Sequence, residues 1–495
     1  MKCEISPNDP MKINKSENPH IRILACLRLI FMVLLISSGC KKFLDIKPDT
    51  NTGNNPHLIA DFEQMLNNAA LAAPDYLPAD LMSDDVMLAD NLLGTYSSSF
   101  YVKAYQWWPV IWDASENDPM YNNSYRMILQ CNIILDRINA VPDGTLAQKN
   151  VVSAQAKVNR AYYYFQLVSL YSKGYHAATA AGDLAVPLVL KPDAALLPER
   201  ATVQQVYAQI LQDLQEGINT TDLPDFGVDV IHPGRAAALA LQARVYLFMG
   251  DYAKALTVAN AVLKIKSTLL DYNKFSFVNG VNPENGVYNK PLTLTDETTN
   301  PEALLSRVCT NSEFYGKFFS APFISDDLKA FLGDTDLRYI YNFTPGDGSA
   351  RATYFIYNLS AILFNYGIGV PEMMLIKAEC LARQGDAAGA LAQLELIRKF
   401  RYKPEDYVPL VNTGAEDALK QVLAERRKEL FLHGGLRLFD LKRLNMDSRF
   451  SKDIVRISVT DGHTIATLKP GSPAYLMPFA PQIIAANPKI IQNPR

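Results

Sequence analysis

Two stretches of the chain repeat one pattern of small and large apolar residues on either side of a short turn. The first runs from Gly234 to Leu263 and contains "MGDYAKAL", and the second runs from Pro371 to Phe400 and contains "GDAAGAL". In both stretches apolar residues recur with the 3.6-residue period of an amphipathic helix, and a Gly-Asp pair interrupts that period. Each stretch therefore predicts two helices joined by a tight turn.

The first of these stretches has small and aromatic residues where a tetratricopeptide-type hairpin needs them for packing, at Ala240, Ala243, Gly250, Tyr252, Ala255 and Ala259. The two Gly-Asp pairs are 135 residues apart, whereas the repeat of a tandem array is about 34 residues. The sequence thus predicts an all-α protein in which tetratricopeptide-like helical hairpins form a scaffold that long insertions interrupt.

Other segments with helical periodicity extend this scaffold, at 125–141, 156–175, 203–218 and 416–444, the last broken at Gly434-Gly435. Residues 75–119 and 270–364 lack a sustained helical period, and we expect loops with short strands there; the tail 454–495 is expected to be mostly extended. Binding residues often lie on loops held by a rigid frame, so the two loop-rich insertions are predicted to form the ligand-binding surface.

The N-terminus has the order of a bacterial lipoprotein signal. Arg22 and Arg28 precede the apolar run "LIFMVLLI", which is followed by "SSG" and Cys40. We expect residues 1–39 to be removed as a signal peptide, Cys40 to be acylated, and residues 40–495 to form the mature domain. An ordinary signal with a coincidental cysteine is the alternative, because Ser37 stands where such signals usually have Leu.

Composition argues against several functions. The net charge of −3 gives no electrostatic footprint for nucleic acid. Cys131, Cys309 and Cys380 are widely spaced, which predicts neither disulfides nor a metal site, and Cys131 and Cys380 are interpreted as small buried hydrophobes. The six histidines show no HxH or HxxxH spacing. We therefore predict no metal and no cofactor.

Two acidic pairs, Asp84-Asp85 and Asp326-Asp327, are interpreted as turn or capping residues, because a glycosidase needs two carboxylates that face each other across a bond. We predict no catalytic residues. The charged run "ERRKE" (425–429) is interpreted as a solvated helix face with ion pairs between Glu425 and Lys428 and between Arg426 and Glu429. A docking patch for an anionic partner is the alternative.

All three tryptophans of the chain, Trp107, Trp108 and Trp112, lie in "QWWPVIWD". Trp107 and Trp108 are consecutive, so in an extended chain they point to opposite sides and at least one should be exposed or line a groove. Flat aromatic rings with a polar tip suit the C–H faces of sugars. The predicted ligand-binding residues, with core packing as the alternative, are Tyr96, Tyr101, Trp107, Trp108, Phe314 and Tyr315.

Five blocks in order make the chain similar to a known family. They are "CKKFLDIKP" (40–48), "ARVYLFMGDYAKAL" (243–256), "PEMMLIKAECLARQGD" (371–386), "AERRKELFLHGGLRLFDLKRL" (424–444) and "YLMPFAPQIIAANPKIIQNP" (475–494). They resemble the SusD/RagB-type outer-membrane lipoproteins of Bacteroidetes. Departures occur at His433, where the family usually has an acidic residue, and at Leu436, where it often has His.

The resemblance implies a non-catalytic, lipid-anchored protein exposed at the cell outer membrane. Such a protein binds nutrient oligosaccharides and delivers them to a SusC-like TonB-dependent transporter. The resemblance also implies that Trp112 packs into the scaffold. Two alternatives remain: a peptide-binding RagB-type receptor, and a lipid-anchored scaffold for protein–protein contacts.

Overall fold

Long helices packed side by side form the scaffold in the computed structural model of the chain. The model describes residues 56–193, 195–278, 287–289, 300–310, 322–345, 354–356 and 363–495, and His57–Arg495 form a single unit. The scaffold helices are α7 (Pro119–Arg137), α8 (Leu146–Tyr171), α9 (Val203–Asn219), α10 (Arg235–Met249), α11 (Tyr252–Ile265), α15 (Val370–Arg383), α16 (Ala387–Arg398) and α17 (Ala415–Glu429). Mostly helical architecture confirms the predicted fold class.

The two predicted hairpins are α10–α11 and α15–α16, and the Gly-Asp pairs make both turns. Gly250 and Gly385 have φ of +75° and +91°, a region in which an L side chain is strained. The Asp251 side chain then accepts from the Lys254 N–H at 3.1 Å, and Asp386 accepts from the Gly389 N–H at 2.8 Å. Each pair therefore ends one helix and caps the next.

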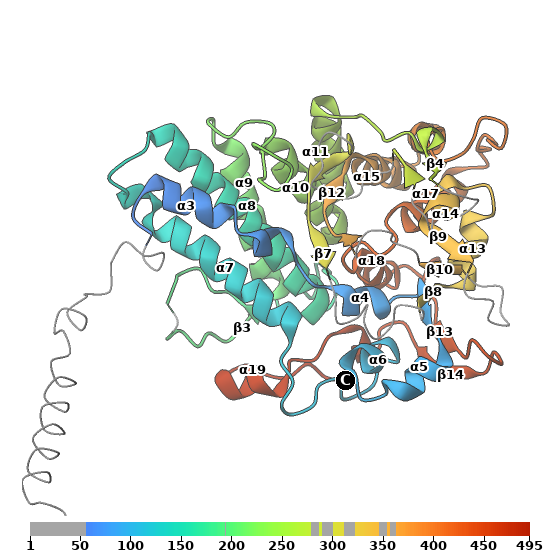
Figure 1. The fold of residues 1–495 in the computed structure, drawn as a ribbon, viewed down its shortest axis with the longest axis horizontal. Coiled ribbons are helices and arrows are strands. Elements are labelled where there is room, and N and C mark those ends of the chain that lie inside the picture. The colour runs from blue at the N-terminus through green and yellow to red at the C-terminus, as the bar shows by residue number, and fades with distance from the viewer. Residues whose placement is uncertain are drawn as a thin grey trace, which may run out of the picture. The chain divides into compact units, whose positions relative to one another are not determined.

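The hairpins continue one row of helices. Helix α7 packs on α8, α8 on α9, α9 on α10, and α11 directly on α15, although a long insertion separates α11 from α15 in the sequence (Figure 1). A capping box formed by Thr202 and Gln205 opens α9. A second box, at Thr145 and Gln148, starts α8 ten residues before its predicted beginning.

The chain also forms shorter helices. They are α3 (Ile59–Leu66), α4 (Leu77–Leu81), α5 (Asp90–Thr95), α6 (Phe100–Tyr105), α13 (Asp326–Leu332), α14 (Leu337–Asn342), α18 (Leu436–Leu444) and α19 (Pro481–Ala486), with 3₁₀ turns at Ala69–Ala72, Ile138–Ala140, Tyr272–Lys274 and Pro473–Tyr475. The predicted break between α17 and α18 occurs where Gly434 and Gly435 have φ of +67° and +80°. No described helix is both long enough and apolar enough to cross a bilayer.

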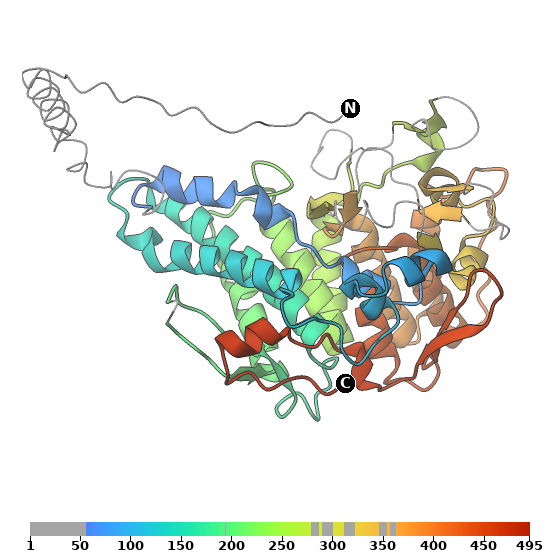
Figure 2. The same ribbon diagram turned by 60° about the horizontal axis from the view of Figure 1, so that its bottom comes forward.

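A small antiparallel sheet joins the two predicted insertions. Its order is β1 (Val86–Leu88), β8 (Pro322–Ile324), β10 (Tyr354–Ile356) and β9 (Phe343–Pro345), and β1 pairs with β8 through Met87 opposite Phe323. Residues 75–119 and 270–364 thus meet in space. Figure 2 shows this part of the molecule beside the strand hairpin of residues 454–468.

Pairs of short strands make up the remaining described sheets. They are β2 (Leu184–Pro187) with β3 (Arg200–Thr202), β4 (Ser276–Phe277) with β5 (Val287–Tyr288), β6 (Ala303–Leu305) with β12 (Ile368–Gly369), β7 (Val308–Thr310) with β11 (Leu363–Asn365), and β13 (Ile454–Ile457) with β14 (Thr464–Leu468).

Helix α8 lies in the core, and every residue from Val158 to Tyr171 is buried. Its tyrosines place their hydroxyls on acceptors in loops: Tyr162 donates to the Tyr366 carbonyl at 3.0 Å, and Tyr164 donates to the Val189 carbonyl at 2.8 Å. Cys131 and Cys380 are buried free thiols, which confirms their interpretation as small hydrophobes.

The interpretation of "ERRKE" as a solvated face is wrong. Glu425, Arg426, Arg427 and Lys428 are all buried, because α17 is covered by α13, α15 and α16. The pair of Glu425 and Lys428 does form, at 2.9 Å. Arg426, however, binds Asp440 at 2.8 Å rather than Glu429. Burial also removes these side chains from any docking patch.

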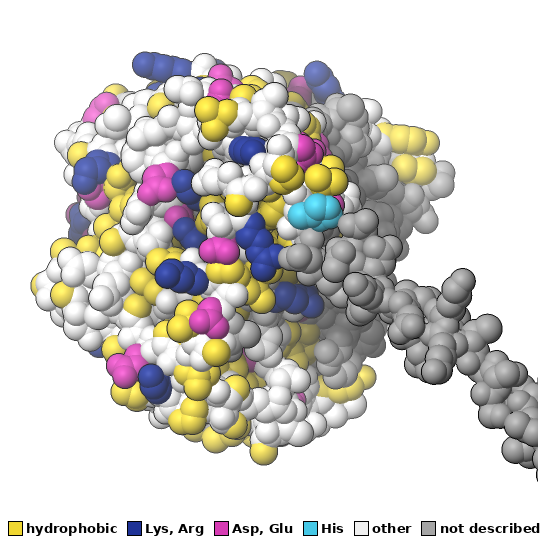
Figure 3. Space-filling view, turned by 90° about the vertical axis from the view of Figure 1, so that its left-hand side faces the viewer, with side chains coloured by type: hydrophobic (Ala, Val, Ile, Leu, Met, Phe, Trp, Pro, Cys, Tyr) yellow, Lys and Arg dark blue, Asp and Glu magenta, His cyan; other side chains and the backbone are white. Residues whose placement is uncertain are grey.

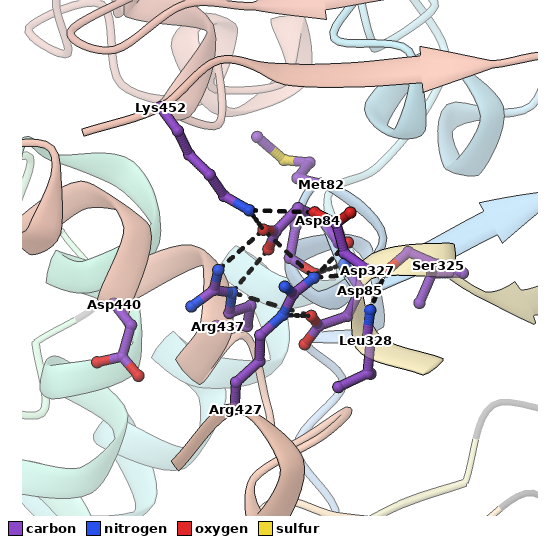
Figure 4. A network of polar contacts seen from close by, with 12 residues as sticks. Met82, Asp84, Asp85, Ser325, Asp327, Leu328, Arg427, Arg437, Asp440 and Lys452 are labelled. Carbon is purple, nitrogen blue, oxygen red and sulfur yellow. Dashed lines mark hydrogen bonds and ion pairs between the residues drawn. The ribbon is translucent and has the colours of Figure 1, made fainter. Parts of the chain in front are cut away.

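Asp84-Asp85 lie in the bend between α4 and β1, as a turn position requires, but their side chains are buried and bind cations instead of capping a helix. Arg427 donates to Asp85 at 2.6 Å, Arg437 donates to Asp84 at 2.6 Å, and Lys452 lies 2.7 Å from Asp84 (Figure 4). In contrast, Asp326-Asp327 lie in the first turn of α13, whose N-cap is Ser325.

We predict that Arg427→Ala lowers the free energy of unfolding by about 3–5 kcal/mol, because Asp85 would remain buried without its cation. Urea denaturation would measure this loss. Lys420→Ala on the same helix is the matched control, since Lys420 pairs with Glu416 in solvent and its loss should leave stability close to wild type. Equal losses in the two variants would contradict the structural importance of the buried network.

Candidate ligand-binding face

A left-handed turn separates the two consecutive indoles. Helix α6 ends at Tyr105, and Trp107 follows with φ of +54°. Trp107 is 6% exposed and Trp108 is 43% exposed. The expectation that at least one of them faces outward is therefore confirmed, although the turn rather than an extended chain separates their side chains.

Trp107 is held on several sides. Its Nε1 donates to the Met82 carbonyl at 3.0 Å, and the Arg456 guanidinium lies 4.3 Å from its ring centre. The same guanidinium lies 4.1 Å from the ring of Tyr105. Cation–π contacts of this kind strengthen when the cation is shielded from water.

Arg456 comes from β13 and is buried, and no carboxylate among the described residues pairs with it. Its guanidinium instead donates to four backbone carbonyls at 2.6–3.2 Å, those of Leu81, Ser83, Val86 and Tyr105. Burial lowers the pKa of Arg456. One side chain therefore ties the end of α4, the start of β1 and the end of α6 together.

The backbone of Trp108 is fixed on both sides of its exposed ring. Its N–H donates to the Lys103 carbonyl at 2.9 Å, and its carbonyl accepts from Arg495 Nε at 2.5 Å. Arg495 also donates to the Leu476 carbonyl at 2.6 Å. Pro109 and Val110 beyond it are exposed. A flat apolar surface is thus presented from a preorganised backbone.

The positive φ of Trp107 has an energetic meaning. A bulky residue in this region costs on the order of 1–3 kcal/mol, and such residues cluster at binding and switch sites. The contacts of Trp107 with Met82 and Arg456 offset this strain. Because of this turn, the side chain of Trp108 points outward.

Of the other predicted residues, the structure describes Tyr96 and Tyr101, and neither is exposed. Tyr101 is buried and Tyr96 is half-buried against the core. Neither Tyr101 nor Trp107 offers a ring face to solvent, so direct stacking by these two is not supported. Phe314, Tyr315 and Cys40 lie outside the described residues. Tyr288 is exposed on β5, but the β4–β5 pair lies well away from α6 (Figures 1 and 2).

Trp112 packs into the scaffold, as the resemblance implied. It is buried, its Nε1 donates to the Pro478 carbonyl at 2.8 Å, and its ring lies 5.1 Å from that of Phe100. The C-terminal tail therefore packs over Trp112.

The acidic pair Asp84-Asp85 is bound by cations. Although burial opposes it, Arg437 and Arg427 hold the pKa of Asp84 well below its usual range. Burial raises the pKa of Asp85 against the charge of Arg427. Both side chains are buried and bound to arginine, which leaves them unsuited to acid–base work on a substrate. No group of three or more His, Cys, Asp or Glu among the described residues is suited to a metal ion.

Sequence reasoning missed Arg456 and Arg495. A signal was available for Arg456, because Ile454 and Arg456 alternate with exposed Val455 in β13, which places the arginine on the buried side. No local pattern marks Arg495 as the partner of Trp108.

Two family profiles match the chain and together cover more than half of it. One is described as "Starch-binding associating with outer membrane" and matches residues 42–247. The other, described as "SusD family", matches residues 370–495. No match was found among curated proteins.

Solved structures share the fold at low sequence identity. A SusD superfamily protein from Bacteroides thetaiotaomicron is 20% identical with a TM-score of 0.69, over 88% of this chain and 100% of that one. A SusD superfamily protein from Bacteroides fragilis is 20% identical with a TM-score of 0.68, over 88% and 100%. A SusD-like carbohydrate binding protein from Bacteroides vulgatus is 20% identical with a TM-score of 0.65, over 88% and 98%.

The helical scaffold and these matches define the class of outer-membrane-associated, carbohydrate-binding proteins that carry out no catalysis. The chain belongs to the SusD/RagB family.

Substitution should separate the roles of the two neighbouring indoles. Trp107→Ala is expected to lower the free energy of unfolding by about 3–5 kcal/mol, because it empties a buried site. Trp108→Ala should change it by less than about 1 kcal/mol. Urea unfolding followed by circular dichroism gives both values, and a large loss in Trp108→Ala would show that its indole is structural.

Proposed function

We propose that the protein captures nutrient oligosaccharides at the cell surface and passes them to a SusC-like TonB-dependent transporter. The observation that carries this proposal is the exposed indole of Trp108 on a backbone fixed by Lys103 and Arg495. Family membership supports the carbohydrate class of the ligand.

Stacking of the indole on the C–H face of a pyranose ring is the expected contact. Tryptophan offers a large apolar face for such a ring. Because its backbone is already fixed, little ordering is needed on binding, and preorganisation of this kind improves affinity. The half-buried Tyr96 is a second candidate contact, and Phe314 and Tyr315 remain candidates from the sequence.

A neutral ligand agrees with the charge distribution. The net charge of the chain is −3, which gives no excess of positive charge that would favour a polyanion. On the side of the molecule that carries α3, away from Trp108, basic, acidic and hydrophobic side chains are interspersed without a field of one sign (Figure 3).

The proposal also includes a lipid anchor at Cys40 and a transporter in the same membrane. We infer that Cys40 is acylated after removal of residues 1–39, which would hold the protein at the membrane. A transporter at the same membrane would contact the ligand a second time, and two linked contacts bind more tightly than either alone. The affinity of this protein by itself can therefore be modest.

Isothermal titration calorimetry against plant, fungal and host glycans, with a peptide panel beside them, tests the ligand class. We expect at least one oligosaccharide to bind with a millimolar or lower Kd. Trp108→Ala should weaken that binding at least tenfold, whereas Trp108→Phe should retain part of it because a flat ring remains.

Phe331→Ala is the matched control, since Phe331 is also an exposed aromatic residue and lies on α13. Its binding should equal that of wild type. Binding of peptides alone would replace oligosaccharides as the ligand, and glycan binding that is indifferent to Trp108 would place the site elsewhere.

A second test addresses the anchor. Cys40→Ser should move the protein from the outer-membrane fraction to the soluble fraction. Mass spectrometry of the wild-type N-terminus should show acyl chains on Cys40. An unmodified wild-type cysteine would refute the lipid anchor while leaving the glycan measurements intact.

A further inference from the structure

A concave pocket lies on the helical scaffold, where α3, the first half of α8 and the loop before α10 form its walls. Its volume is about 470 Å³, and its lining residues are Glu63, Leu66, Asn67, Ala147, Gln148, Val151, Val152, Gln155, Val228 and His232. Helix α3 lies on the left of Figures 1 and 2, away from α6. This pocket is therefore separate from the face around Trp108.

The walls of the pocket are aliphatic. Leu66, Val151, Val152 and Val228 line it, and no Phe, Tyr or Trp is among the described lining residues. Sugar rings are usually held by aromatic faces, so this pocket does not repeat the chemistry proposed for Trp108. Aliphatic walls suit an aliphatic ligand body.

A polar side chain in the pocket has unused hydrogen-bonding capacity. Gln155 is 6% exposed, and no donor or acceptor in the described part of the chain pairs with its side-chain amide. Neither polar atom of this amide is among the buried atoms that lack a partner, so the amide is open to the pocket and can bind a ligand there. The Gln155 carbonyl oxygen supplies one acceptor at the wall.

The ring of His232 supplies a second acceptor. Asp229 Oδ1 lies 2.7 Å from His232 Nδ1, and an ionised carboxylate can only accept, so Nδ1 carries the hydrogen. When the ring is neutral, its Nε2 can accept a hydrogen bond, and no described residue pairs with this atom.

The loop that carries His232 is rigidly held. Asp229 also accepts from the backbone N–H groups of Ile231 and His232, at 2.8 and 2.9 Å. A Cβ at Gly227 would lie 1.9 Å from the His232 carbonyl oxygen, so only glycine fits there. Arg307 fixes the loop from behind by donating to the Ile231 carbonyl at 3.1 Å.

The charge of the pocket is negative. Glu63 is the lining residue that carries a full charge at neutral pH, and no lysine or arginine is among the described lining residues. A carboxylate, an amide oxygen and an imidazole nitrogen give three acceptors. An ammonium group has three donors and no acceptor.

We propose that this pocket binds a small molecule that carries a primary ammonium on an aliphatic body. The ammonium is held by Glu63, the Gln155 oxygen and His232 Nε2, and the body lies against Leu66 and the valines. This site is independent of the proposed glycan capture.

Three probes of one shape test the proposal: cyclohexylmethylammonium, cyclohexylmethanol and cyclohexanecarboxylate. Binding to the purified protein at neutral pH is followed by ligand-observed nuclear magnetic resonance. We expect the ammonium to bind with a Kd of millimolar order, as befits so few atoms. The alcohol should bind at least fivefold more weakly, and the carboxylate should not bind measurably.

Charge reversal gives the sharpest variant. Glu63 is exposed on α3, so Glu63→Lys should fold normally, lose the ammonium by at least tenfold and favour the carboxylate. Glu405→Lys, at another exposed glutamate, makes the same change in net charge and should bind as wild type. Val151→Phe should fill the pocket and abolish binding of all three probes.

Equal affinity for the three probes, no binding of the ammonium, or unchanged binding in Glu63→Lys would each overturn the proposal. Because the glycan titration uses Trp108 variants and a different ligand, failure of one test leaves the other standing.

Discussion

The buried charges of α17 hold the loop-rich part of the molecule on the scaffold. Glu425 binds Arg338 at 2.6 Å, Arg426 binds Asp440 at 2.8 Å, and Arg427 binds Asp85 at 2.6 Å. Burying charges carries a large desolvation penalty, which is offset only when each charge meets a partner with good geometry. Since the partners lie on α14, on α18 and beside β1, these segments are held in defined positions relative to α17.

A short series of contacts connects the buried ion pair of Arg427 and Asp85 with the exposed indole of Trp108. Asp85 directly follows the segment whose carbonyls, at Leu81 and Ser83, accept from Arg456. Met82 in that segment accepts from the indole of Trp107. Arg456 stacks on Trp107 and so fixes the turn from which Trp108 projects. Ion pairs inside the scaffold thus support the surface that we propose to bind ligand.

The parts of the fold predicted from the sequence are those set by local chemistry. Gly250 and Asp251 specify a turn through one positive φ and one cap, and both effects act within a few residues. The helices were recognised from the apolar period for the same reason. Their start was missed at α8, where the capping box at Thr145 lies outside the strongest apolar period.

The errors occurred where distant partners decide the outcome. A run such as "ERRKE" satisfies the spacing rule for exposed helical ion pairs, yet Arg427 finds its carboxylate 342 residues away in the sequence. The same limit applies to the aromatic window. Trp107 and Trp108 are identical in type and adjacent, yet contacts made far along the chain help to distinguish them: Arg456 lies against the ring of Trp107, and Arg495 donates to the backbone carbonyl of Trp108.

The number of exposed rings bears on how such a protein would hand over its ligand. A deep aromatic cleft would bind tightly and release slowly, because affinity differences appear mainly in the dissociation rate. If Trp108 is the main contact, as we propose, one indole on a fixed backbone would bind weakly and would require no rearrangement before the ligand leaves. If the ligand must pass to a transporter, this balance is favourable, since the transporter supplies the second contact. The buried Arg456 supports the turn at Trp107, and the weak binding that we propose for Trp108 follows instead from the small area that one ring offers.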